Sequence, residues 1–155
     1  MSLGEFFPEA FKADYARRNL DVGSVLKLYV KDTKPPKEKR FIIVGKNIDG
    51  ICLATVYINS EINEKINYFP ELKELHLPFQ AAGRTYLDHD SFVDCSEFVI
   101  REQKEIELAI KNRPGVVIGK LCEMDLTAVK NKLINSPKIK GKDKKRFGLY
   151  PEYLK

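Results

Sequence analysis

Residues 21–60 read DVGSVLKLYV KDTKPPKEKR FIIVGKNIDG ICLATVYINS, and the pattern of this stretch decides the expected fold. Two apolar runs, FIIV and ICLATV, flank the polar turn sequence NIDG. Gly50 closes that turn and accepts the positive φ that tight hairpin turns require, so the stretch predicts a β-hairpin. A lysine-rich, proline-containing loop leads into the hairpin and ends in Lys39 and Arg40, which puts a basic pair at the start of a strand.

The rest of the chain adds short strands and helices to this hairpin. Further strands are expected at 23–30, 75–80, 91–94 and 116–119, and helices at 5–18 and 124–134. The helices are predicted from apolar residues at three-to-four-residue spacing, and the strands from short β-branched or alternating runs. Segment 98–111 has both signals and is left open between strand and helix. Together these elements indicate a mainly β protein with peripheral helices, built around a small, strongly bent barrel.

Composition divides the chain into an N-terminal helical extension at 1–20, a barrel domain at 21–135 and a basic tail at 136–155. The net charge is +5, and residues 136–147 alone hold six basic residues against one acidic residue, a net of +5. The remaining residues therefore sum to zero, so the high isoelectric point does not by itself indicate a nucleic-acid-binding barrel. The tail has three possible roles: an RNA-binding arm, a disordered solubilising end, or a strap that docks through residues 148–154.

Nothing in the sequence predicts a membrane segment or a metal site. No apolar run approaches the roughly 20 residues that span a bilayer, and the N-terminus has no apolar core after a basic start, so we expect a cytoplasmic protein. The three cysteines, Cys52, Cys95 and Cys122, are odd in number and widely spaced, which argues against a disulfide framework and a zinc site. Cys122 stands just before the last expected helix and is a weak candidate for its cap.

The order of several motifs resembles the PemK/MazF family of toxin ribonucleases. That family starts with a glycine-initiated strand, here from Gly23, followed by a loop that ends in a basic residue and an arginine, here Lys39 and Arg40. A hydrophobic strand with a hydroxyl-bearing end comes next, and Ser60 is the nearest match to that end. The family closes with a Gly-x-Leu segment and a short helix, which residues 119–133 resemble.

This resemblance implies an SH3-type, PemK-like barrel that cleaves single-stranded RNA without a metal or another cofactor. Such cleavage requires neutralisation of a pentacoordinate phosphate, and the resemblance gives that role to Arg40, whose guanidinium can bind two phosphate oxygens. Ser60 is its counterpart as the hydroxyl that contacts the phosphate. Proteins of the family usually work as homodimers, and a cognate antitoxin typically inserts a flexible acidic segment across the RNA groove.

Residues around this pair are the candidate RNA contacts. Lysines and arginines contact phosphates, while aromatic side chains stack on the bases of single-stranded RNA. The candidates for these contacts are Lys37, Lys39, Asn59, Tyr57, Phe79 and Arg84. The two histidines, His76 and His89, are the candidates for proton transfer near neutral pH, and His89 is flanked by carboxylates.

Two other interpretations remain open. Phe41 stands where the family usually has proline, and the hydroxyl-bearing segment is reduced to Ser60, which favours a catalytically inactive barrel that binds RNA or a protein. The third interpretation is a structural or host-interaction protein whose groove is filled by its own termini. Phe7 and Phe11 at one end, or Tyr150 and Tyr153 at the other, are the residues that would fill it.

Overall fold

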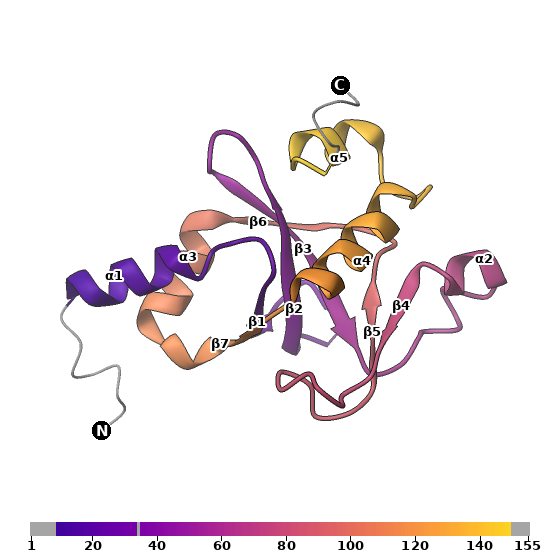
Figure 1. Cartoon of the computed structure of the whole chain (residues 1–155), viewed down its shortest axis with the longest axis horizontal. Helices are drawn as coiled ribbons and strands as arrows, with labels where there is room; N and C mark the ends of the chain where they lie inside the picture. The colour runs from indigo at the N-terminus through magenta and orange to yellow at the C-terminus, as the bar shows by residue number, and fades with distance from the viewer. Residues whose placement is uncertain (1–8, 34, 150–155) are drawn as a thin grey trace.

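A strongly curled antiparallel sheet runs through the protein, with helices around it (Figure 1). The computed structural model describes residues 9–33 and 35–149. Its strands are β1 (Ser24–Val30), β2 (Lys37–Lys46), β3 (Cys52–Asn59), β4 (His76–Phe79), β5 (Ser91–Asp94), β6 (Val99–Glu102) and β7 (Val117–Lys120). The helices are α1 (Glu9–Arg18), α2 (Pro70–Lys73), α3 (Gln103–Asn112), α4 (Glu123–Ile134) and α5 (Gly141–Arg146), with a 3₁₀ turn, η2 (Pro114–Val116).

The strand order β4-β5-β3-β2-β1-β7 makes half of a barrel. The sheet curls at β3, because one edge of this strand pairs with β6 through residues 52–55 and with β5 through residues 58–59. A register shift between Ile43 and Gly45 bends β2 against β3. The expected barrel-like sheet is confirmed in this coarse form, and helices and strands occupy similar lengths of the described chain, so the protein is a mixed sheet-and-helix structure.

The expected hairpin and its turn are present between β2 and β3. Gly50 has φ of +67°, in the region that glycine adopts without strain. The Asn47 side-chain oxygen accepts hydrogen bonds from the backbone N–H groups of Ile51 (2.9 Å) and Cys52 (3.2 Å), which closes the turn. Segment 98–111, for which the sequence left strand and helix open, forms a strand and then a helix. β6 ends at Glu102 and α3 begins at the next residue.

Both faces of the sheet are covered, which explains why the sequence of β2 contains a continuous apolar run. Phe41 and Ile43 point into a core shared with α1 and α3, whereas Ile42 and Val44 point into a core shared with α4. Successive side chains of a strand point to opposite faces, so a strand covered on both sides needs apolar residues at every position. Figure 1 shows α4 across one side of the sheet and α1 beside α3 at one end.

The segment expected as a basic tail packs onto the sheet as far as it is described. Ile139, Phe147 and Leu149 belong to the same core as α4. Phe147 lies against Gly45, where an added Cβ would come within 2.7 Å of it. The expected strap residues Tyr150 and Tyr153 lie outside the described residues, as do the first residues of the helix expected from residue 5.

A buried lysine ties this segment to α4. The Lys144 ammonium donates hydrogen bonds to the carbonyl oxygens of Ile134 (2.7 Å) and Ser136 (2.9 Å), just where α4 ends. The last carbonyls of a helix have no partner within the helix, and a cation there also interacts favourably with the helix dipole. At the other end of α4, Cys122 is a weak cap as expected, because its sulfur accepts from the N–H of Asp125 at 3.5 Å. No described helix is long and apolar enough to cross a membrane.

Candidate nucleic-acid interface

The basic pair Lys39 and Arg40 is divided between the two faces of the sheet. Arg40 follows the alternation of Ile42 and Val44, on the face covered by α4, while Lys39 follows that of Phe41. The expected site residues therefore fall into two groups. One group gathers around Lys39 and the other around Arg40.

The first group contains Lys37, Lys39, Tyr57 and Asn59, and we call it the lysine face. The Lys39 ammonium donates a hydrogen bond to the side-chain oxygen of Asn59. It also lies 5.2 Å from the centre of the Tyr57 ring, within the range of a cation–π contact. Lys37 is two residues earlier on β2 and therefore on the same side. The pKa of Lys39 is lowered, first by burial and then by the charge of Lys37, against the opposing effect of Asp94.

Arg101, from β6, lies beneath this group and was not anticipated. Its guanidinium is 4.8 Å from the centre of the Phe41 ring and 5.6 Å from that of Tyr57. Nη2 donates to the Tyr57 hydroxyl at 2.6 Å and pairs with Asp32 at 3.4 Å. The side chain is 10 % exposed, so Arg101 orients the Tyr57 ring from below. The sequence signal was a charged residue inside an apolar, partly alternating segment.

The Tyr57 hydroxyl also donates a hydrogen bond to Asp32, so Asp32, Tyr57 and Arg101 form a hydrogen-bonded triad. Burial, together with the hydrogen bond to Asp32, raises the pKa of Tyr57 to about 12. For Asp32, burial acts to raise the pKa, but the hydrogen bond from Tyr57 and the charge of Arg101 outweigh it and lower the pKa. At neutral pH the neutral phenol therefore sits between an ionised carboxylate and a guanidinium, and their charges offset one another. The net positive charge of the lysine face comes from Lys37 and Lys39.

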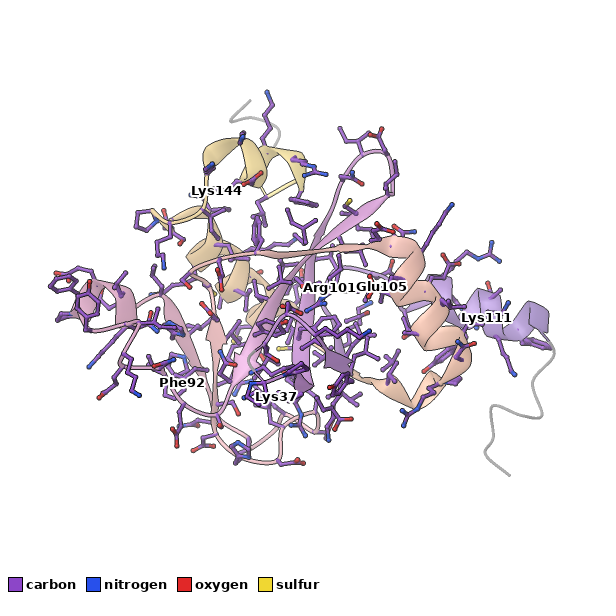
Figure 2. The ribbon with its side chains drawn as sticks, turned by 180° about the vertical axis from the view of Figure 1, so that it is seen from behind. Lys37, Phe92, Arg101, Glu105, Lys111 and Lys144 are labelled. Atoms are coloured by element: carbon purple, nitrogen blue, oxygen red, sulfur yellow. The ribbon has the colours of Figure 1, made fainter. Side chains whose placement is uncertain are left out.

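Phe92 extends the lysine face across β5. It is the register partner of Asn59 on β3 and of Pro78 on β4, and it is half-buried. Directly paired residues of antiparallel strands point to the same side, so Phe92 and Asn59 are neighbours on one surface. Figure 2 labels Lys37, Phe92 and Arg101, which belong to β2, β5 and β6, the three strands that pair with β3. Two aromatic rings thus flank the amide of Asn59.

The second group centres on Arg40. Its Nε donates to the Tyr86 carbonyl oxygen at 3.1 Å, and its Nη2 pairs with the Asp88 carboxylate at 2.7 Å. The Arg40 side chain is 20 % exposed, so its direction is fixed by the loop that carries these two residues. Ser60 is exposed, one residue beyond β3 and two beyond Ile58, the register partner of Arg40. The alternation of β3 continues towards Ser60 on the Arg40 side.

Arg84 and Phe79 belong to neither group. Arg84 forms a two-pronged ion pair with Asp125 of α4, with both contacts at 2.9 Å, and donates to the Gln80 carbonyl oxygen. Its guanidinium lies 4.4 Å from the centre of the Phe79 ring. Phe79 is 2 % exposed, so it offers no open ring face in this conformation. These contacts attach the loop that holds Arg40 to α4.

The two histidines lie in different surroundings. His76 is buried, with Nε2 3.0 Å from the Asn67 side-chain oxygen and Nδ1 3.9 Å from an Asp94 carboxylate oxygen. His89 is exposed and directly follows Asp88, the ion-pair partner of Arg40. Within residues 9–33 and 35–149, no group of three or more His, Cys, Asp or Glu side chains is arranged to hold a metal ion.

No protein-family model, curated protein or solved structure matches the chain. The argument for its function therefore rests on the two groups of side chains around Lys39 and Arg40.

Proposed function

We propose that the protein binds single-stranded RNA on the lysine face. One observation carries this proposal: the Lys39 ammonium contacts both the amide of Asn59 and the ring of Tyr57, so a cation, a hydrogen-bonding amide and an aromatic ring share one surface. Lys37 and Lys39 would bind phosphates, and Tyr57 and Phe92 would stack on bases. The amide of Asn59 can hydrogen-bond to base edges, which are accessible only in an unpaired strand.

The support by Arg101 makes this arrangement suitable for stacking. An aromatic ring held from below by a guanidinium and by a hydroxyl hydrogen bond loses little freedom when a base is placed on it. Because Asp32 offsets the charge of Arg101, the attraction for phosphate depends on the two lysines. We therefore expect binding that weakens steeply as salt is added.

The test is the affinity of the purified chain for a labelled single-stranded RNA and for the same sequence as a duplex, measured by fluorescence anisotropy. Lys39→Ala should weaken binding and reduce the salt slope by about 1, as expected for one lost phosphate contact. Tyr57→Phe keeps the ring and should retain most of the affinity, whereas Tyr57→Ala should lose it. Lys142→Ala, at an exposed position of α5, is the matched control. Equal affinities of Lys39→Ala and Lys142→Ala would contradict the proposal.

A second candidate is metal-independent endoribonuclease activity in a PemK/MazF-like, SH3-type barrel. The observation that favours it is the register of β2 and β3, which pairs Arg40 with Ile58, two residues before Ser60. In such a reaction the RNA 2′-oxygen attacks the adjacent phosphorus and the 5′-oxygen leaves, which forms a cyclic phosphate. Arg40 would stabilise the phosphorane and Ser60 would contact it. The homodimer and the antitoxin implied by the resemblance belong to this proposal, as does the cytoplasmic location expected from the sequence.

Cleavage and binding are separated by assaying RNA fragments in the presence of EDTA. If the endoribonuclease proposal is right, the wild-type chain produces RNA fragments. Ser60→Ala and Arg40→Ala should each abolish them. Growth arrest on induced expression should disappear with the same substitutions. Intact RNA with wild type, together with salt-dependent binding, would leave the first proposal standing and remove the second.

A further inference from the structure

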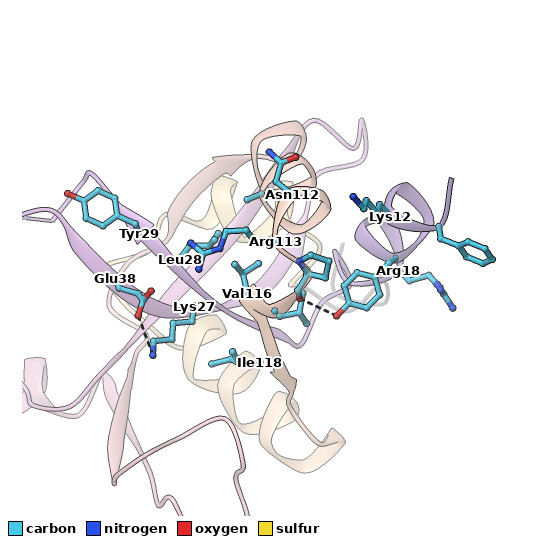
Figure 3. A pocket seen from close by; sticks show the side chains of 16 residues that line it. Lys12, Arg18, Lys27, Leu28, Tyr29, Glu38, Asn112, Arg113, Val116 and Ile118 are labelled. Atoms are coloured by element: carbon cyan, nitrogen blue, oxygen red, sulfur yellow. Dashed lines mark hydrogen bonds and ion pairs between the residues drawn. The ribbon is translucent and has the colours of Figure 1, made fainter. Parts of the chain in front are cut away.

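A groove lies between α1, β1 and the η2 turn (Figure 3). Its volume is about 1100 Å³. The apolar part of its lining is mostly aliphatic: Leu28, Ala109, Val116, Val117 and Ile118. In Figure 3, Tyr29 stands on one side and Lys12 and Arg18 on the other. The space is thus an apolar groove between two walls of different elements.

The β1 wall of this groove is an unpaired strand edge. β1 pairs with β2 through Val25–Val30, but β7 pairs only with Ser24, Val25 and Leu26. Within residues 9–33 and 35–149, no strand therefore pairs with the second side of β1 from Lys27 to Val30, and Lys27, Leu28 and Tyr29 line the groove there. Alternate residues of such an edge present their N–H and C=O groups outwards, which is a template for another strand.

The charged side chains around the groove are mainly basic. Among the described residues, Lys12, Arg18, Lys27, Arg113 and Glu38 line it, and Arg18 pairs at 3.1 Å with Asp14 of the same helix. Glu38 is 3.3 Å from Lys27, and its side chain is 56 % exposed. An exposed ion pair of this kind is weak, so its lysine can exchange partners with an incoming carboxylate.

Two large aromatic side chains at the groove are exposed. Phe11 of α1 is 60 % exposed and Tyr29 of β1 is 64 % exposed. Aromatic residues around a concave apolar surface are typical anchors of a protein interface. Single-stranded RNA fits this groove less well, because a nucleic acid cannot pair with a strand edge.

We propose that this groove binds an extended, acidic segment of another protein, which adds as a strand to the edge of β1 from Lys27 to Val30. Backbone hydrogen bonds to β1 hold the segment, and its apolar side chains contact Leu28 and the η2 turn. Its carboxylates face the basic residues of the rim, which complements their charge. This site adjoins the lysine face, because Leu28 is the register partner of Lys39, but it does not depend on either proposed RNA activity.

The test uses a displayed library of random peptides of about a dozen residues, selected on the full-length chain. The enriched peptides should combine aspartate or glutamate with aliphatic or aromatic residues. Synthesised and labelled, they should bind the Arg113→Glu chain about tenfold more weakly, in proportion to a reversed rim charge. Lys104→Glu, at an exposed position of α3 outside the groove, is the matched control, and thermal melting verifies that both variants are folded.

Strand addition has its own readout in amide hydrogen exchange. Bound peptide should slow the exchange of outward-facing amides between Lys27 and Val30, while those of β4 should remain unchanged. Neutral or basic enriched peptides, or equal binding by Arg113→Glu and Lys104→Glu, would overturn the proposal. So would unchanged exchange in β1. Self-association, or RNA binding, that is lost in Arg113→Glu alone would assign the groove to a second copy or to RNA and would likewise overturn it.

Discussion

Lys39 and Arg40 are consecutive residues of β2 whose side chains engage partners on opposite faces of the sheet. Lys39 contacts Asn59 and Tyr57, and Arg40 contacts Tyr86 and Asp88. One stretch of RNA lying on one face cannot touch both side chains. The binding proposed at Lys39 and the chemistry proposed at Arg40 are therefore separable by substitution.

The lowered pKa of Lys39 predicts a specific pH dependence of RNA binding. Lysine binds phosphate only when protonated, and burial disfavours that form, so Lys39 loses its charge at a lower pH than the ordinary value of 10.5. Wild-type affinity should therefore fall as pH rises towards 10.5 from below. Lys39→Arg stays charged throughout this range and should fall less.

The measurement is anisotropy with a 2′-O-methyl oligonucleotide, which resists alkaline cleavage, at constant ionic strength. Lys142→Arg serves as the control, since replacing the exposed Lys142 ammonium should not change the pH dependence of binding. Parallel pH curves for wild type and Lys39→Arg would rule out a role for Lys39 charge in binding.

Arg101 should be important for stability, because its guanidinium is enclosed between two rings. Arg101→Lys keeps the charge but loses the planar stacking on Phe41 and the geometry of the bond to Tyr57. We expect the free energy of unfolding to fall by about 1–3 kcal/mol, the usual range for a lost buried charged hydrogen bond. Urea titration followed by circular dichroism measures it.

Arg113→Lys is the matched change at an exposed arginine and should alter stability by less than about 0.5 kcal/mol. If Arg101→Lys and Arg113→Lys lower the free energy of unfolding equally, the Arg101 guanidinium does not make the stabilising contacts with Phe41 and Tyr57.

The ion pair between Arg84 and Asp125 predicts an acid-sensitive contribution to stability. The hydrogen bond from Arg84 lowers the pKa of Asp125 below the ordinary 3.8, against the opposing effect of burial. A carboxylate with a lowered folded-state pKa stabilises the protein above its unfolded value, and this stability is lost as pH falls from about 3.8 towards the lowered pKa. Asp125→Asn should be less stable than wild type at pH 7, and the difference should shrink below pH 3.8.

A double-mutant cycle with Arg84→Met at pH 7 should give a coupling energy of about 1–3 kcal/mol. Because this pair attaches the loop that carries Tyr86 and Asp88, any activity that depends on Arg40 should fall as well. A coupling energy near zero would show that the two side chains act independently.

The contact between Gly45 and Phe147 predicts that even a methyl group is too large at position 45. A Cβ there would lie 2.7 Å from both the Cβ and the carbonyl oxygen of Phe147, and backbone atoms cannot yield as a flexible side-chain end can. Gly45→Ala should lower the free energy of unfolding by about 1–3 kcal/mol, the usual cost of overpacking. Gly115→Ala is the control, since nothing lies within 4 Å of its added Cβ, and it should be neutral or slightly stabilising.

The buried ammonium of Lys144 predicts that this lysine is structural. Lys144→Met retains most of the apolar stem but removes the donor to the Ile134 carbonyl oxygen, and leaves the Ser136 carbonyl oxygen with only the 3.4 Å bond from the Ile139 N–H. The expected loss is about 1–3 kcal/mol per unsatisfied buried group, measured by thermal and urea unfolding. Lys145→Met, at the neighbouring exposed position, should have little effect, and similar losses for both would contradict this role.

Local elements were predictable where the signal lies within a few residues. The hairpin around Gly50 and the helix beginning near Met124 follow from turn chemistry and apolar spacing, which depend only on neighbours in the chain. The ambiguous segment 98–111 contained a strand and then a helix, and its mixed pattern reported both. The packing of residues 136–149 was less predictable, because the six basic residues in that region conceal its buried members Ile139, Phe147 and Leu149.

The candidate site was predictable only in part. Lys37 and Lys39 share a face because side chains alternate along any strand, and the same rule separates them from Arg40. Arg84 looked like a phosphate ligand, but its partner Asp125 is distant in sequence, and its engagement is visible only in the fold. Arg101 and Phe92 joined the site through strand pairings that no local pattern specifies.

By itself, therefore, the sequence determined the hairpin, the main helices and the alternation that sorts β2 side chains between two faces. These properties arise from the local preferences of the backbone and the spacing of apolar residues. The tertiary structure alone decided that β5 and β6 share one edge of β3, that Asp125 pairs with Arg84, and that no described strand pairs with the groove side of β1 from Lys27 to Val30. Each of these depends on contacts between distant segments, whose free energy comes from the packing of the whole chain.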